Sequence, residues 1–89
     1  MAGTLHFSLV SPERQVFSGD VDQVDAPGAE GDFGVLPNHA PFMTALREGI
    51  VTVYIGASRR VFEVKGGFAD VNADGLTILA EEASETGAA

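Results

Sequence analysis

The sequence predicts an all-β fold, a flattened β-sandwich or barrel of about eight to ten short strands. Eleven glycines and four prolines separate short apolar segments along the chain. Several of these segments alternate with a period of two residues, and no stretch shows a convincing helical period. With 89 residues, 45% of them hydrophobic, the chain has the length of one domain and enough apolar surface to fold.

The first half of the chain contains the clearest alternation. Leu5, Phe7 and Leu9 fall on one face of the segment 4–10, with polar residues on the other face, as in a half-buried strand. The stretch 28–41 is rich in glycine and proline and is expected to be mostly loop. The strands expected in this half are the segments 4–10, 15–18, 21–26 and 42–46.

The second half carries the strongest strand and turn signals. The segment 50–55 is β-branched and aromatic, which suits a central strand. Gly56, Ala57 and Ser58 connect it to the next strand in a natural hairpin. The sequence Asn-Ala-Asp-Gly at 72–75 is a strong turn signal. The strands expected in this half are the segments 50–55, 59–65, 68–71 and 76–80.

We expect one β-sandwich domain over residues 4–81 and a polar, frayed tail over residues 82–89. The tail contains helix-forming residues, but it is too short to hold a helix alone, since about 12 residues are marginal in water. No C-terminal helical hairpin is therefore expected. The core residues expected from the alternation are Leu5, Phe7, Leu9, Val24, Phe42, Leu46, Val53, Phe62, Val64, Phe68 and Ile78.

Composition excludes several classes of function. There is no cysteine, which removes disulfides and thiol chemistry. The formal charge of −8 disfavours nucleic acid and anionic lipid as partners, and it serves solubility or steers a basic partner. The apolar runs are far shorter than the roughly 20 residues of a membrane span, and the N-terminus lacks a basic segment before an apolar one. We expect a protein that is soluble, not exported and not inserted directly into lipid.

The residues offer little that would support catalysis. His6 and His39 lie far apart and form no metal-binding cluster, so no metal and no other cofactor is expected. The glycine-rich stretch 28–34 lacks the Lys-Ser/Thr ending of a phosphate loop and is favoured as a tight β connection. Glu30 and Asp32 form no recognisable catalytic pair, because a domain of this size seldom encloses a cleft. An enzyme is not expected.

His39 is flanked by two prolines that stiffen its backbone. Its imidazole could hydrogen-bond within its own turn, or it could contact a partner. The residues alone leave both readings open.

Several motifs resemble one family over nearly the whole chain and in the right order. They are GDFGVLPNHAP at 31–41, GGFADV at 66–71, LAE at 79–81, VSPE at 10–13 and VFSG at 16–19. Together they resemble the family of epsilon subunits of bacterial F-type ATP synthases. The resemblance implies a flattened β-sandwich in the central stalk that rotates with the gamma subunit and the ring of c subunits.

The resemblance also implies contact roles for particular residues. Glu30, Gly31 and Asp32 match the loop that lies against the c ring, and Ser11 and His39 match residues that lie towards gamma. The implied role is non-catalytic: the subunit helps couple proton transport to ATP synthesis. Family members commonly continue into two C-terminal helices that restrain ATP hydrolysis and in some members bind ATP. The given sequence stops at Ala89, either as the stump of that region or as the natural end of a short member, and neither property is carried over.

The implied location is peripheral, on the cytoplasmic face of the bacterial inner membrane, held there through the complex. The alternative function is a free-standing small-ligand-binding β module, which would require a polar-lined cavity.

Overall fold

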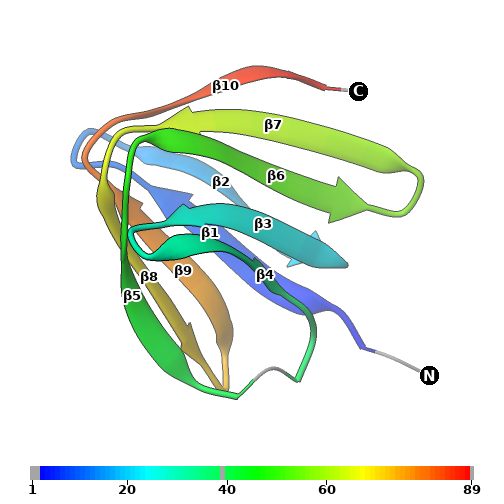
Figure 1. The fold of residues 1–89 in the computed structure, drawn as a ribbon. Helices are drawn as coiled ribbons and strands as arrows, with labels where there is room; N and C mark the ends of the chain where they lie inside the picture. Colours follow the sequence, from blue (N-terminus) through cyan, green and yellow to red (C-terminus); the bar gives the residue numbers. More distant parts are fainter. Residues whose placement is uncertain (1–2, 39, 89) are drawn as a thin grey trace.

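The structure is a computed structural model, and it describes residues 3–38 and 40–88. Ten strands run through these residues, which contain no helix (Figure 1). The strands are β1 (Leu5–Val10), β2 (Gln15–Val21), β3 (Gln23–Gly28), β4 (Gly31–Val35), β5 (Phe42–Leu46), β6 (Gly49–Ile55), β7 (Ser58–Val64), β8 (Gly67–Asn72), β9 (Gly75–Ala80) and β10 (Ala83–Ala88).

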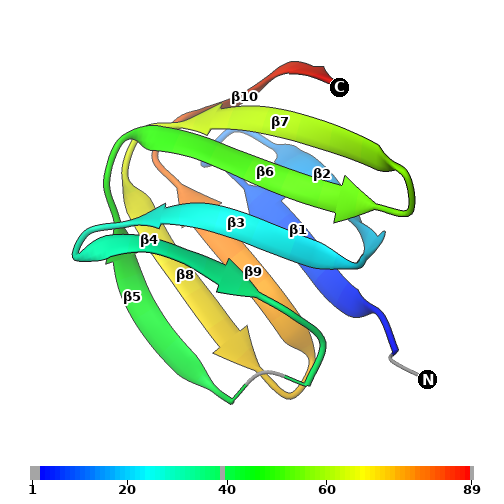
Figure 2. The same ribbon diagram turned by 45° about the vertical axis from the view of Figure 1, so that its right-hand side comes forward.

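The strands form two layers, as the sequence predicts. The hydrogen-bonded order is β10-β7-β6-β3-β5-β8-β9-β1-β2, and β4 pairs with β3 (Figure 2). One layer therefore holds β10, β7, β6, β3 and β4, and the other holds β5, β8, β9, β1 and β2. The layers are joined at one seam by the pairing of Gly28 in β3 with Leu46 in β5. At the other seam β2 approaches β6 and β10. The prediction of a flattened sandwich close to a barrel is confirmed.

The space between the layers is filled by apolar side chains from both sheets. Nine of the eleven core residues predicted from the alternation are buried, and Phe42 is partly buried against them. Phe68 is a wrong prediction, because 55% of its surface is exposed. Its neighbours Ala69 and Val71 are the inward-facing residues of β8. Since side chains alternate along a strand, Phe68 has to face outward.

Two segments differ from the expectation of loop or frayed ends. Residues 31–35, expected to be mostly loop, form β4, which pairs with β3 along its whole length. Residues 83–88, expected to belong to a frayed tail, form β10 and pair with β7.

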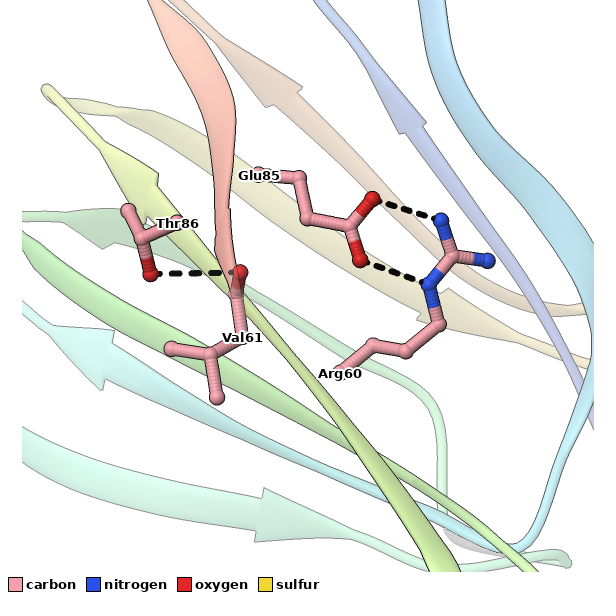
Figure 3. Close-up of polar contacts among 4 residues, drawn as sticks. All are labelled: Arg60, Val61, Glu85 and Thr86. Carbon is pink, nitrogen blue, oxygen red and sulfur yellow. Dashed lines mark hydrogen bonds and ion pairs between the residues drawn. The ribbon is translucent and has the colours of Figure 1, made fainter. Parts of the chain in front are cut away.

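Side chains reinforce the attachment of β10 (Figure 3). Arg60 donates two hydrogen bonds to the Glu85 carboxylate, at 2.7 and 2.8 Å, and Thr86 donates one to the Val61 carbonyl oxygen at 3.4 Å. The hydrogen bonds with Arg60 hold the pKa of Glu85 below its usual value. The same guanidinium lies over the ring of Phe17 in β2, 4.9 Å from its centroid. The short segment β10 would not be ordered alone. It is ordered by pairing with β7 and by the Arg60 guanidinium, which contacts side chains of both β10 and β2.

Within the described ranges we find no helix long and apolar enough to cross a bilayer.

Candidate docking surfaces

The three residues predicted to face the c ring lie together at the β3–β4 turn. Glu30 occupies the tip, and Gly31 and Asp32 begin β4, opposite Gly28 and Pro27 of β3. Gly31 has a φ of 142°, a backbone conformation that side-chain-bearing residues rarely adopt. Glu30, Gly31 and Asp32 are all exposed. The turn is therefore a narrow, glycine-shaped projection that carries two carboxylates.

The turn is fastened to the corner between β5 and β6. The amide of Ala29 donates to the carbonyl oxygen of Ala45 at 2.9 Å, and the amide of Arg47 donates to the carbonyl oxygen of Pro27 at 3.0 Å. The Arg47 guanidinium also forms an ion pair with the Asp32 carboxylate. A projection held by main-chain and side-chain contacts presents a defined shape to a partner.

Ser11, one of the two residues predicted to face gamma, lies in the β1–β2 turn. Its amide and its hydroxyl both donate to the Arg14 carbonyl oxygen, at 2.9 and 3.2 Å, and the Arg14 amide donates back at 3.3 Å. Half-buried Ser11 lines an open groove of about 340 Å³ on the outer face of the sheet. His39, the other predicted gamma residue, lies outside the described residues.

Apolar side chains gather beside this groove in a row that crosses four strands. Strand register places Ala45 of β5 opposite Phe68 of β8, Phe68 opposite Leu79 of β9, and Leu79 opposite Val10 of β1. Phe68 and Leu79 are 55% and 54% exposed. We call these four residues the apolar row. Large apolar side chains that gather on an exposed face mark an interaction site more often than scattered ones do.

Carboxylates flank the apolar row. Asp70 follows Phe68 on the same outward face of β8, two positions along, and exposed Glu81 lines the groove together with Phe68 and Leu79. The arrangement of an apolar centre with an acidic rim suits a partner surface with an apolar centre and basic residues around it.

The outer face of the opposite sheet has a different character. Tyr54 and Gln23 both donate to the Asp25 carboxylate, at 2.9 and 2.7 Å, and the hydrogen bond from Tyr54 to Asp25 raises the pKa of the tyrosine. The Arg59 guanidinium lies 5.6 Å from the centroid of the Tyr54 ring. Ile50 of β6 is the large hydrophobic residue with notable exposure on this sheet, at 47%. Apart from Ile50, the side chains named on this face are polar or charged and already contact one another.

Sequence reasoning missed the apolar row. The row exists because residues from four separate segments share a register, and no local periodicity encodes that register. A usable signal was present, however: Phe68 and Leu79 each sit out of phase with the buried residues on either side of them.

The described residues give little support for a metal site or for a buried small-ligand site. They contain no group of three or more histidine and acidic residues placed to hold a metal ion. None of their polar or charged side chains is buried, and the polar-lined hollow of about 420 Å³ beside His6, Asn72 and Asp74 is open to solvent. His6 lies at the surface, 3.1 Å from the Asp20 carboxylate.

Sequence comparisons with known proteins all point to one family. The sequence model of the ATP synthase delta/epsilon chain β-sandwich domain matches residues 4–86. The ATP synthase epsilon chain of Caulobacter vibrioides is 73% identical over 81 residues, which cover 91% of this chain and 94% of that relative. The epsilon chain of Hyphomonas neptunium is 67% identical over 84 residues, which cover 93% of this chain and 62% of that relative. The chain thus spans less than two thirds of some relatives.

Solved structures share the fold. A chain in the OSCP/F1/c-ring structure of the Euglena gracilis mitochondrial ATP synthase superposes with a TM-score of 0.87 at 26% identity, over 96% of this chain and 55% of that chain. A chain in the central stalk/c-ring structure of the Tetrahymena thermophila enzyme gives a TM-score of 0.77 at 16% identity, over 93% of this chain and 67% of that chain. The second likeness, at such low identity, shows the fold alone.

Proposed function

This chain belongs to the family of ATP synthase delta/epsilon chains, and from that membership we propose that it docks on gamma and on the c ring as a rotor subunit. The epsilon chain is a structural subunit of the complex and is not an enzyme by itself. Its task in the central stalk is to help transmit torque, so that proton transport is coupled to ATP synthesis. The mechanism is rigid complementarity between surfaces, with no bond made or broken.

The observation that carries the gamma contact is the apolar row. Phe68 and Leu79 expose more than half of their surfaces at the centre of one sheet face, whereas on the opposite face Tyr54 and Gln23 are hydrogen-bonded to Asp25 and Ile50 is 47% exposed. Ser11, which the resemblance assigns to gamma, lines the same groove as both side chains. Two independent arguments, one from the motif and one from the surface, therefore select the same face of the sandwich.

The β3–β4 turn is the proposed contact with the c ring. It is narrow and exposed, and it carries the carboxylates of Glu30 and Asp32. A turn of this shape can approach the polar loops of a ring closely, and its charge can attract their cations. The chain is then peripheral on the cytoplasmic face of the bacterial inner membrane, held there by protein contacts and without lipid insertion.

Cross-linking tests both contacts, because the chain has no cysteine of its own. Ser11→Cys and Glu30→Cys each introduce a single thiol for a short thiol-to-amine reagent in the assembled complex. We expect the first variant to cross-link to gamma and the second to a c subunit. Ala57→Cys in the β6–β7 turn provides an exposed control outside both surfaces and is expected to cross-link to neither. Cross-linking of Ser11→Cys or Glu30→Cys only to subunits of the catalytic head would contradict the proposal.

A further inference from the structure

Met43 is the most exposed of the large apolar side chains in the described ranges, with 65% of its surface accessible. It is the second residue of β5, where the alternation turns Met43 and Ala45 outward and buries Leu46. An exposed methionine is reactive as well as apolar, because oxidants can reach its thioether sulfur.

Met43 lies on the same sheet face as the apolar row. Strand register places it opposite Asp70 of β8, which stands two positions from Phe68 on the outward side of that strand. Phe68 is therefore a diagonal cross-strand neighbour of Met43, at a separation that long side chains span. Met43 thus continues the apolar surface along β5, and a partner that covers Phe68 would cover Met43 as well.

The sequence offers an oxidant few other reactive side chains. It contains two methionines, Met1 and Met43, and no cysteine or tryptophan. Met1 lies outside the described residues. When a hydroperoxide meets a thioether, the sulfur attacks one peroxide oxygen, the O–O bond breaks and an S–O bond forms. The thioether is oxidised to a sulfoxide, and hydrogen peroxide is reduced to water.

The surroundings of Met43 are poorly suited to a sulfoxide. A sulfoxide oxygen accepts hydrogen bonds and donates none. The side chain directly opposite, that of Asp70, is a carboxylate, which when ionised also only accepts. Ala45, the next outward residue of β5, has no polar side-chain atom. An apolar partner surface that covered the sulfoxide would leave its oxygen without a hydrogen bond, which costs free energy.

We propose that Met43 is an oxidation site that regulates docking: a hydroperoxide converts its thioether to the sulfoxide, and the modified chain binds gamma more weakly. The step acts on the free chain, because docking would cover the side chain. A thiol-dependent sulfoxide reductase reverses it, since its own cysteine pair is oxidised to a disulfide and the oxygen leaves as water. This inference rests on the proposed function, because it concerns regulation of the gamma surface.

The test treats the full chain with hydrogen peroxide, maps the added oxygen by peptide mass spectrometry, and measures the affinity for the cognate gamma subunit by fluorescence anisotropy. We expect a sulfoxide at Met43 and a Kd about 5- to 30-fold weaker. Treatment with the two epimer-specific methionine sulfoxide reductases and a dithiol should restore the original Kd. The thermal midpoint should stay within a few degrees, since the modified side chain is exposed. When gamma is bound first, Met43 should be oxidised more slowly than in the free chain.

Two variants locate the effect. Met43→Leu keeps an apolar side chain of similar volume and has no sulfur at this position, so we expect it to bind gamma like the original chain before and after peroxide. Adding Ile50→Met to Met43→Leu moves the thioether to the opposite sheet, at a position that is 47% exposed. We expect peroxide to oxidise that thioether without changing the affinity. Both variants retain Met1, so oxidation at Met1 affects every chain alike.

The outcomes separate this inference from the proposed function. If the untreated original chain does not bind gamma, the proposed function fails and this inference fails with it. If it binds, the inference alone is overturned when a chain with the sulfoxide at Met43 binds as tightly as before, or when either variant loses as much affinity after peroxide. It is also overturned if Met43 stays unmodified under conditions that oxidise the methionine introduced by Ile50→Met.

Discussion

The apolar row yields the sharpest prediction about docking. The perturbation is the pair of substitutions Phe68→Thr and Leu79→Thr, which removes the two large side chains at the centre of the row. Threonine keeps the β-branched character that suits a strand. Phe68 and Leu79 are 55% and 54% exposed, so the substitutions leave the buried core intact. Folding should therefore be perturbed by no more than about 0.5 kcal/mol per site.

The size of the effect on binding follows from the exposed fractions. Fully burying a leucine or phenylalanine is worth about 1.5 to 3 kcal/mol. Burying the 55% and 54% that are still exposed is then worth roughly 1.6 to 3.3 kcal/mol for the two side chains together. That range corresponds to a Kd for gamma about 15- to 250-fold weaker, with the upper end as a ceiling because area does not convert fully into affinity.

The assay is fluorescence anisotropy of the labelled chain titrated with the cognate gamma subunit. Ile50→Thr is the matched control, since Ile50 is also apolar and 47% exposed but lies on the opposite sheet. We expect this control to bind gamma like the original chain. The reasoning is refuted if the double variant binds as tightly as the original chain, or if Ile50→Thr loses as much affinity.

The remaining predictions concern the core and the β10 attachment. Phe62 is fully buried and meets the ring of Phe17 edge-on at 5.8 Å between centroids; Phe62→Ala should lower the free energy of unfolding by about 3 to 5 kcal/mol in chemical denaturation, and a loss below about 1 kcal/mol would contradict the assigned core. Glu85 has its pKa lowered by the hydrogen bonds from Arg60, so this pair should stabilise the fold above the ordinary glutamate pKa of about 4.3 and lose that effect as the pH falls through the lower folded value. As the pH is lowered through the acidic range, the denaturation midpoint of Glu85→Gln should fall less steeply than that of the original chain. The same pH dependence in both chains would count against the pairing.

Local patterns predicted much of this fold. The alternation that places Leu5, Phe7 and Leu9 inward is a property of one short segment, and the structure buries all three. Phe68 shows where such patterns stop, because a single bulky residue in a short strand cannot reveal which face meets the other sheet. Register between strands decides that, and register is a long-range property.

The prediction of a frayed tail over residues 82–89 differs from the structure for a related reason. Residues 83–88 have weak strand propensity by themselves, and β7 supplies the hydrogen-bonding partner that orders them. The contacts that fasten this strand, such as the one between Arg60 and Glu85, join positions 25 residues apart. Strand propensity is assessed for each segment alone. It therefore predicts a frayed end even where pairing with another strand orders the segment.

The predicted contact with the ring stays a prediction, and the structure shows only that its three residues lie together at the β3–β4 turn. The glycine-rich motif located the β3–β4 turn, because its resemblance to a known loop is carried by consecutive residues. Nothing in the motif indicated Arg47, which reaches Asp32 only because β5 meets β3 at the seam between the layers. The apolar row likewise depends on how four strands pair, although the phases of Phe68 and Leu79 gave a partial signal.

The most direct test of the docking claim is calorimetric titration of the 89-residue chain into its cognate gamma subunit at low and at high salt. We predict saturable binding with one chain per gamma. The affinity should fall as salt rises, because the acidic rim contributes attraction that ions screen. A folded sample that releases no heat and forms no complex with gamma at either salt concentration would contradict the claim that this sandwich carries the docking surface.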